Sequence, residues 1–328
     1  MTKERTTFET LSVTAILTTL NCCEGLQSCI ERLCGELDIA TFNDVVVVDG
    51  GSTDGTWEVL EQLAQDHPAV RVFQEPGANI SRGRNRAVAL ARGNVILSLD
   101  SGCTMVEGYV GLMTKPFVDD PACDVVGGKT VAVGHGVFEQ CVAMLERGTR
   151  KDTFNPSSRT IAFRKHVFAA IGGYEESIMA GEDTHFNHKW RQAGCKYVHV
   201  PEAMVFWRVR SSLAGLYRMQ RRNITGSIAI GNPWCSADWA MRANIISVAL
   251  SLVSAGIASA GHLWAWYLAV FALAGSSSYV LFRTLRRGRW RFVTNPACLC
   301  LAAAAIFAMD LGTWAGTIRG WRQRCQCS

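Results

Sequence analysis

The sequence lacks several features that would assign a class of protein at once. Its 328 residues carry a net charge of only +5, and the basic residues cluster late in the chain. This mild balance does not predict a nucleic-acid-binding protein. The N-terminal stretch MTKERTTFET has no apolar core of a signal peptide. The 13 cysteines form no repeated CxxC pairs, so we expect reduced thiols in a cytosol-facing protein.

The first hundred residues alternate between strand and helix patterns. Strands are expected over 11–20, 45–48, 70–73 and 94–99, with helices beginning near Asn21, Thr56 and Ser81. Further along, 125–131 is strand-like, and 137–147 and 182–193 have helical spacing. Such alternation predicts an α/β fold with a largely parallel sheet.

The stretch NDVVVVDGGSTDGT, residues 43–56, organises this pattern. Its four valines suit a strand covered on both faces, and the strand ends in Asp49 followed by Gly50, Gly51 and Ser52. An open α/β sheet binds ligands at the carboxyl ends of its strands, where such turns lie. The plainer interpretation is a tight turn with a solvated aspartate.

A second aspartate, Asp100, also ends a buried strand and precedes small residues. On a parallel sheet the two strand ends share one edge, so we expect both carboxylates to line one cleft. Carboxylates bind Mg²⁺ or Mn²⁺, which neutralise a diphosphate, and the arginines of the 81–92 helix add positive charge. Alternatively, Asp100 is a turn residue and these arginines form a solvated face.

Glu182 and Asp183 lie at the expected start of another helix. The helix dipole favours ionised carboxylates there, and an ionised carboxylate can accept a proton from a hydroxyl nucleophile. A simple N-terminal capping pair is the alternative.

The joint order of VVVVDGGSTDGT, SRGRNRAVALARG, LSLDSG and GGYEESIMAGEDTHF resembles the family-two inverting glycosyltransferases, which have the GT-A fold. The similarity covers about residues 10–225. It implies a nucleotide-sugar donor, a divalent cation (Mn²⁺ or Mg²⁺) and direct displacement at the anomeric carbon.

The resemblance also implies roles for particular residues. Asp49 would contact the base or ribose of the donor, Asp100 would bind the metal ion, and Asp183 would be the general base, with Glu182 beside it. Arg159, in PSSRTIAFRK, falls in the acceptor-side half and is expected to bind acceptor or phosphate. The expected donor-binding set is Thr18, Asn21, Asp49, Gly51, Ser52, Arg82, Asn85 and Asp100.

Three departures from the family pattern stand out. The first strand ends in Thr18-Thr19-Leu20-Asn21 where the family commonly has PTYN, so a stacking tyrosine is absent. Asp100-Ser101-Gly102 lacks the second carboxylate of a DxD motif. The segment that begins at Gln220 lacks the QxxRW motif of processive members, which predicts a non-processive enzyme.

The composition changes after residue 243. Two uncharged apolar runs, 244–261 and 263–282, are long enough to be membrane helices, and the arginine-rich loop 283–291 should face the cytosol. A third run, 296–309, is short and broken by Asp310, so it could cross the membrane, re-enter it or lie at its surface. Before these runs, 208–222 reads as a basic amphipathic helix suited to an anionic membrane surface. From charge and position alone, Arg208, Arg221 and Arg222 are expected to hold a lipid phosphate or the donor diphosphate.

Together these features predict a GT-A domain over residues 1–225, with a nucleotide-binding half at 10–103 and an acceptor half at 104–225, followed by a membrane region at 226–328. The expected function is that of a multi-pass cell-membrane glycosyltransferase acting at the cytosolic face on a lipid-linked or envelope-glycan acceptor. One alternative is a sugar-phosphate nucleotidyltransferase, although its usual glycine-rich basic loop is missing. The other is a non-catalytic membrane scaffold with a degenerate transferase domain, which Gly102 keeps open.

Overall fold

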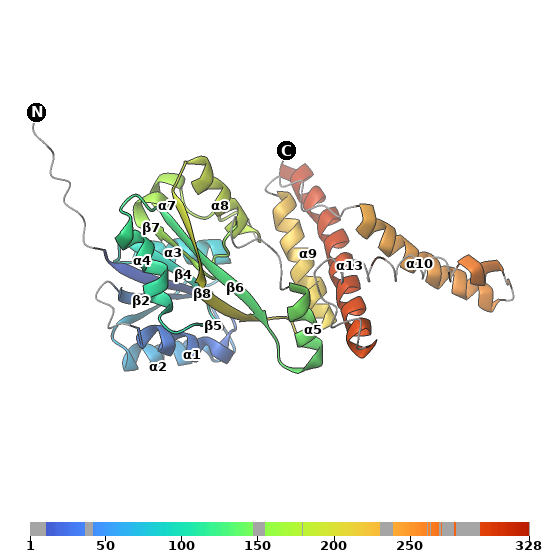
Figure 1. Cartoon of the computed structure of the whole chain (residues 1–328), viewed down its shortest axis with the longest axis horizontal. Helices are drawn as coiled ribbons and strands as arrows, with labels where there is room; N and C mark the ends of the chain where they lie inside the picture. Colours follow the sequence, from blue (N-terminus) through green and yellow to red (C-terminus); the bar gives the residue numbers. More distant parts are fainter. Residues whose placement is uncertain are drawn as a thin grey trace, which may run out of the picture. The chain divides into compact units, whose positions relative to one another are not determined.

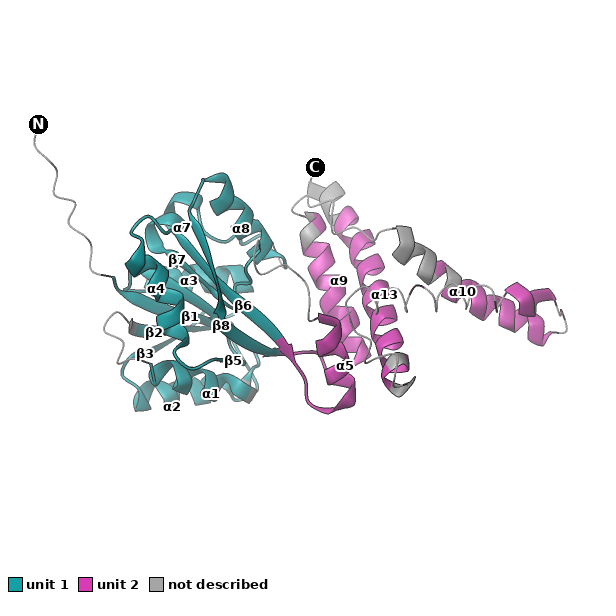
Figure 2. Cartoon of the chain, in the orientation of Figure 1, with its two compact units in different colours: residues 1–131, 150–207 teal, residues 132–149, 208–328 magenta. Residues whose placement is uncertain are grey.

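The computed structural model describes residues 11–36, 42–146, 155–178, 180–229, 239–260, 262, 264–268, 270, 279 and 296–327. The chain divides into two compact units (Figure 2). The first comprises residues 1–131 and 150–207, and the second comprises 132–149 and 208–328. Each unit is described by itself below.

The described strands form one sheet in the order β3-β2-β1-β4-β7-β6-β8-β5. Strands β1 (Val13–Thr19), β2 (Phe42–Asp49), β3 (Val70–Gln74) and β4 (Val95–Asp100) pair in parallel, as predicted. Strand β7 (Ile161–Arg164) then pairs antiparallel with β4 and with β6 (Val125–Val133). Strand β5 (Cys103–Met105) pairs antiparallel with β8 (Tyr197–Arg208). The parallel half of the sheet therefore runs directly into an antiparallel half.

Helices cover both faces of the parallel strands, because the strands are apolar on both faces. One face packs against α1 (Cys23–Cys34), α2 (Thr56–Asp66) and α4 (Tyr109–Asp119). The other packs against α3 (Ile80–Leu90), α7 (Lys165–Ile171) and α8 (Glu182–Gln192). Figure 1 shows α1 and α2 on one side of the sheet and α7 and α8 on the other. Leu26, Ile30 and Leu33 lie on one face of α1 and are fully buried against the sheet.

The cap of α3 differs from the prediction. Asn79, not Ser81, caps this helix: its extended backbone precedes the first turn, and its side-chain oxygen accepts the Arg82 amide hydrogen. Ser81 lies inside the first turn and is fully buried. Asparagine and serine are both good helix caps, so the cap is decided by where the preceding Pro-Gly loop ends and the helical backbone begins.

The second unit contains α5 (Gly136–Glu146), α9 (Leu213–Ala229), α10 (Trp239–Ser259) and α13 (Pro296–Cys327). Helix α13 packs along α9. The third apolar run was expected to end at Met309, before Asp310, whereas α13 is 32 residues long and continues through Asp310 to Cys327. Asp310 is buried at 1% exposure and has a bonding partner, and a single partnered aspartate is a modest penalty inside a helix.

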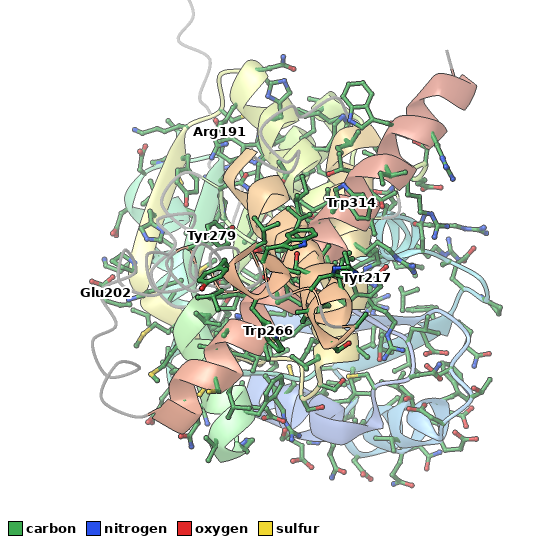
Figure 3. All side chains as sticks on the ribbon, turned by 90° about the vertical axis from the view of Figure 1, so that its right-hand side faces the viewer. Arg191, Glu202, Tyr217, Trp266, Tyr279 and Trp314 are labelled. Atoms are coloured by element: carbon green, nitrogen blue, oxygen red, sulfur yellow. The ribbon has the colours of Figure 1, made fainter. Side chains whose placement is uncertain are left out.

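In the described part of the chain, one stretch is long and apolar enough to cross a membrane, by length and composition only. It is Cys300–Arg322, within α13. In α10 the apolar part, Val248–Ser259, is shorter than the predicted span at 244–261. Most of the span predicted at 263–282 lies outside the described residues, as does the arginine-rich loop at 283–291. Trp266 and Trp314, labelled in Figure 3, are among the exposed large apolar side chains of this unit.

Candidate active site

The candidate site lies at the carboxyl ends of β1, β2 and β4. Strand β1 is between the other two, with Thr19 opposite Asp49 and Thr18 opposite Asp100. The predicted common edge is therefore confirmed. Side chains alternate along a strand, so the two carboxylates leave opposite faces of the sheet, and the expectation that both line one cleft beyond the strand ends stays a prediction. Asp49 continues the face of Val47, whereas Asp100 continues the opposite face, that of Ile96.

Asp49 organises its own turn. It is fully buried, and its Oδ2 accepts hydrogen bonds from the backbone amides of Gly51 (3.0 Å) and Ser52 (2.9 Å). Its Oδ1 accepts a further bond from the Ser52 hydroxyl. Gly51 has a φ of 95°, a backbone conformation that favours glycine. The turn is therefore fixed by the carboxylate that the sequence singled out.

Asn21 joins the ends of β1 and β2. It is exposed, with a φ of 50°, and its side-chain oxygen accepts the Thr53 amide hydrogen at 2.9 Å. Its own amide donates to the Ser52 hydroxyl at 2.8 Å. Thr18 packs against Gly83 of α3, where an added Cβ would lie 3.0 Å from the threonine methyl group. These contacts hold two predicted donor-binding residues at the sheet edge.

The centre of the site is Arg84, which projects from α3. Its Nη2 donates to Asp100 Oδ1 and its Nη1 to Glu182 Oε1, both at 2.7 Å. The Arg84 side chain is 3% exposed, and its guanidinium lies 5.4 Å from the ring centre of Tyr174. Burial alone would lower the pKa of Arg84, but the carboxylates of Asp100 and Glu182 raise it above its ordinary value. This arginine is therefore a fixed positive charge that joins the end of β4 to the start of α8.

Glu182 and Asp183 occupy the first turn of α8, as predicted, after Gly181 with a φ of 83°. Glu182 is engaged by Arg84, so its charge is already paired. Asp183 is half-buried and accepts the Thr184 amide hydrogen at 2.7 Å. Burial, and then the Glu182 charge, raise the pKa of Asp183, while Arg84 and Arg159 oppose the shift. Of the pair, Asp183 is the carboxylate suited to exchange a proton.

Arg159 approaches Asp100 from its other oxygen. The Arg159 Nε lies 3.1 Å from Asp100 Oδ2, and its guanidinium stacks 4.9 Å from the ring centre of Trp207. Unlike Arg84, its side chain is 36% exposed. Asp100 thus sits between a buried and an exposed guanidinium.

Two other predicted donor-binding residues have structural partners. Arg82 is half-exposed and pairs with Glu75 rather than with the carboxylates of the site. Asn85 fastens α3 to the loop before α8: its side chain donates to Tyr174 O (2.9 Å) and accepts the Tyr174 amide hydrogen (3.0 Å). The structure therefore does not bring Arg82 into the Arg84 network.

The three arginines predicted from charge alone belong to the second unit. Arg208 donates from Nε and Nη2 to the buried carboxylate of Glu139, at 3.1 Å each. The Arg221 guanidinium lies 5.5 Å from the ring centre of Tyr217, and Arg222 is exposed. The predicted amphipathic helix begins later than expected, because Arg208 ends β8 and α9 starts at Leu213. Arg208 is thereby a partner of Glu139.

Sequence reasoning missed the part that Arg84, Tyr174 and Trp207 play. A usable signal was present for Arg84, since Arg84, Ala87 and Val88 share one face of α3 at helical spacing. An arginine on an apolar helix face needs a buried carboxylate partner. Its two partners lie 16 and 98 residues away, and pattern reading does not locate them.

The side chains at this site decide whether it can bind a divalent cation. In the described residues no group of three or more His, Cys, Asp or Glu side chains could hold a metal ion. Asp100 is the one carboxylate at the DxD position, because Ser101 and Gly102 follow it. Mg²⁺ and similar ions are commonly held by one or two carboxylates plus substrate phosphates and water. The residues fit a cation that arrives with a diphosphate, and do not build a cage for one alone.

Comparison with solved structures defines the class. A mannosyltransferase from Pyrobaculum calidifontis, PcManGT in complex with GDP-Man and Mn²⁺, superposes with a TM-score of 0.60 at 16% identity, over 96% of this chain and 88% of that one. GalNAc-T7 with UDP, GalNAc and Mn²⁺ gives a TM-score of 0.55 at 14% identity, over 72% and 51% of the two chains. The chain has the GT-A type of mixed α/β fold that was predicted.

The sequence contains a recognisable family domain. Residues 14–171 match the profile of Glycosyl transferase family 2, so the chain carries a domain of that family. The succinoglycan biosynthesis protein ExoA of Rhizobium meliloti is 26% identical over 62% of this chain and 64% of its own length. Glycosyltransferase AglE of Haloferax volcanii is 23% identical over 56% and 62%. The chain spans less than two thirds of the length of these curated relatives.

Proposed function

We propose that this protein is an inverting, non-processive glycosyltransferase that moves a sugar from a nucleotide-sugar donor to an acceptor hydroxyl. The observation that carries the proposal is the Arg84 network. It joins Asp100, at the strand end where such folds bind the donor, to Glu182 and its neighbour Asp183 at the start of α8. A strand-end carboxylate, fixed cations and one carboxylate with a raised pKa are the parts that this transfer needs.

The residues act on the two sides of the reacting bond. Displacement at the anomeric carbon places positive charge on the sugar ring and negative charge on the departing diphosphate. The buried Arg84 supplies fixed positive charge at Asp100, such preorganised charge lowers the barrier, and the half-exposed Arg159 adds a second positive charge beside it. Asp183 accepts the proton of the acceptor hydroxyl, because its carboxylate is not engaged by Arg84. Glu182 holds Arg84 in place for both tasks.

A divalent cation, Mn²⁺ or Mg²⁺, is part of the proposal. Asp100 would hold it together with donor phosphates, and the ion would neutralise charge on the leaving diphosphate. Support comes from the solved structures of PcManGT and GalNAc-T7, which contain Mn²⁺ with a sugar nucleotide or nucleotide.

The proposed setting is the cytosolic face of the cell membrane, with a lipid-linked or envelope-glycan acceptor. The apolar stretch Cys300–Arg322 supports a membrane anchor, and the relative ExoA is named a succinoglycan biosynthesis protein. Residues 1–225 would form the transferase part and 226–328 the membrane part, with 244–261 and 263–282 as further spans. Arg221 and Arg222 would face lipid phosphate from α9, whereas the pairing of Arg208 with Glu139 leaves that residue a weaker candidate.

The testing experiment is donor hydrolysis by the full chain, purified in detergent. A panel of nucleotide sugars is incubated with Mn²⁺, Mg²⁺ or EDTA, beside an Asp183→Asn variant. Slow, metal-dependent release of one nucleoside diphosphate that the variant loses is the expected result. A membrane extract is then added as acceptor source, and the anomeric configuration of the product reports inversion.

The opposite outcome is equally clear. If no donor is hydrolysed or transferred, and none raises the melting temperature, the cleft does not bind nucleotide sugars and the proposal fails. Stabilisation by a donor without turnover, with or without membrane extract, would instead identify a binding protein.

A further inference from the structure

Asp100 is held by two guanidinium groups in very different surroundings. Arg84 reaches Oδ1 from inside the protein, with 3% of its side chain exposed, and Glu182 fixes it on the far side. Arg159 reaches Oδ2 at 3.1 Å with 36% of its side chain exposed. A partly exposed ion pair of this kind is the weaker one, whereas breaking the buried contact of Arg84, which also bonds Glu182, is costly. Of the two partners, Arg159 is therefore the one that can leave Asp100.

Arg159 also makes a cation–π contact. Its guanidinium lies 4.9 Å from the ring centre of Trp207 on β8, a stacked position that does not depend on Asp100. Trp207 pairs with Cys103 of β5, which follows directly after the Asp100-Ser101-Gly102 turn. If Arg159 keeps its contact with Trp207 when Asp100 changes partner, its guanidinium remains beside the turn that follows Asp100.

We propose that Arg159 is an exchangeable counter-ion of Asp100. It neutralises the carboxylate in the free protein, releases it when a divalent cation and a diphosphate arrive, and then pairs with that diphosphate. A guanidinium and a metal cation that both bind Oδ2 of Asp100 repel one another. The released guanidinium can instead form a bidentate pair of hydrogen bonds with two diphosphate oxygens. The inference deepens the proposed function, on which it rests, by assigning one residue two successive partners.

The test uses binding rather than turnover, so that its outcome is separate from that of the proposed function. Arg159→Gln removes the charge, and Lys115→Gln is the matched control. Lys115 is an exposed cation paired with Asp119 on α4, away from the site. Binding of Mn²⁺ alone to the full chain is measured by electron paramagnetic resonance. Binding of UDP and of GDP is measured by calorimetry in the presence of saturating Mn²⁺. Unchanged circular dichroism and melting temperature establish that both variants fold.

Opposite shifts are expected in the two measurements. Arg159→Gln should bind Mn²⁺ about fivefold more tightly, the scale of one exposed ion pair, and should bind the favoured nucleoside diphosphate more weakly by a similar factor. Lys115→Gln should change neither. Arg159→Lys, which restores charge without the planar fork, should recover the Mn²⁺ affinity of the wild type but only part of the diphosphate affinity.

Two results overturn the inference. If Arg159→Gln weakens Mn²⁺ binding, then Arg159 holds Asp100 in its binding position and does not compete with the ion. If neither affinity changes, Arg159 is a surface residue without a part in binding. A wild-type chain that binds Mn²⁺ and diphosphate as expected but transfers no sugar would sink the proposed function while leaving this inference intact.

Discussion

Asp183 carries a charge that its surroundings disfavour, and this sets the first prediction at the residue scale. Its pKa is raised in the folded chain, chiefly by burial and then by Glu182. The folded state therefore holds a proton more tightly than the unfolded chain does. The stability associated with this group is present below the ordinary aspartate pKa and falls as pH rises through the raised value. Near neutral pH the ionised carboxylate of Asp183 therefore lowers the stability of the folded state.

Asp183→Asn should accordingly lose activity and gain stability. Donor turnover should fall by about 10²- to 10⁴-fold, the usual contribution of a general base. The free energy of unfolding at pH 7 should rise by up to about 1 kcal/mol, because the residue is only half-buried and the disfavoured charge is gone. Rate measurements and urea denaturation at pH 5 and pH 8 check both effects. A variant that is inactive and less stable than wild type at pH 8 would contradict this account of the charge.

Arg84 gives the second residue-scale prediction. Arg84→Met leaves the carboxylates of Asp100 and Glu182 without their buried partner, and removing one member of a buried ion pair costs about 3–5 kcal/mol. Adding Glu182→Gln should return part of that loss, since one unpaired charge disappears. Arg86→Gln, at a side chain that is 50% exposed on the same helix, should stay within about 0.5 kcal/mol of wild type. Urea midpoints of wild type, Arg84→Met, Glu182→Gln and the double variant form a double-mutant cycle. Additive losses would show that Arg84 and Glu182 are not coupled.

At the scale of elements, sequence patterns predicted most of the parallel half of the sheet. The valines of β2 and the helical stripe of α1 carry local signals, because each pattern repeats within one element. The same reasoning missed Arg84, since its meaning depends on Glu182 far along the chain. It also did not anticipate that Asp49 and Asp100 continue opposite faces of the sheet, which follows from the alternation of side chains along each strand.

Helix α13 shows why apolar runs alone do not set helix ends. The sequence pattern stopped at Met309, but the helix continues to Cys327. It does so in contact with α9, where Gly312, Gly316 and Gly320 come close to the partner helix. A Cβ on Gly316 would lie 2.6 Å from the carbonyl oxygen of Arg221. Such a close approach between helices tolerates only glycine, and the recurrence of glycine every four residues is the sequence pattern that goes with it.

Gly316→Ala therefore provides the element-scale prediction. Alanine normally favours a helix over glycine by about 1 kcal/mol, but here it must push α9 and α13 apart, which costs about 1–3 kcal/mol. Gly256→Ala in α10 is the matched control, because an added Cβ there meets nothing within 4 Å. Thermal melting of the full chain in detergent should show a lower midpoint for Gly316→Ala and an equal or higher one for Gly256→Ala. Equal effects of the two substitutions would mean that α9 and α13 do not pack through glycine.

At the scale of the whole molecule, the chain combines a compact α/β unit with a helical unit that exposes large apolar side chains. In the first unit exposed apolar residues are scattered, for example Val118 at 62% exposure. In the second they gather on α10 and the residues that follow it, including Leu250, Leu252 and Val253. Scattered residues need no partner, whereas a contiguous apolar surface does. Under the proposed function, the apolar side chains of α10 contact membrane lipid.

The last prediction tests that partner with one charge. Leu252, at 71% exposure on α10, would contact lipid if this helix enters the bilayer, and a charged residue at the centre of an inserted helix costs about 2.5–3.5 kcal/mol. Leu252→Asp should therefore shift the chain from the membrane pellet to the supernatant after carbonate extraction, or leave it more easily extracted. Val118→Asp introduces the same charge at a similarly exposed apolar site on α4 of the first unit and should leave the distribution unchanged.

Equal behaviour of both variants and wild type would place α10 outside the bilayer and leave α13, with its stretch Cys300–Arg322, as the anchor to examine. Release of both variants alike would instead point to a general loss of folding, which circular dichroism of the released protein would reveal.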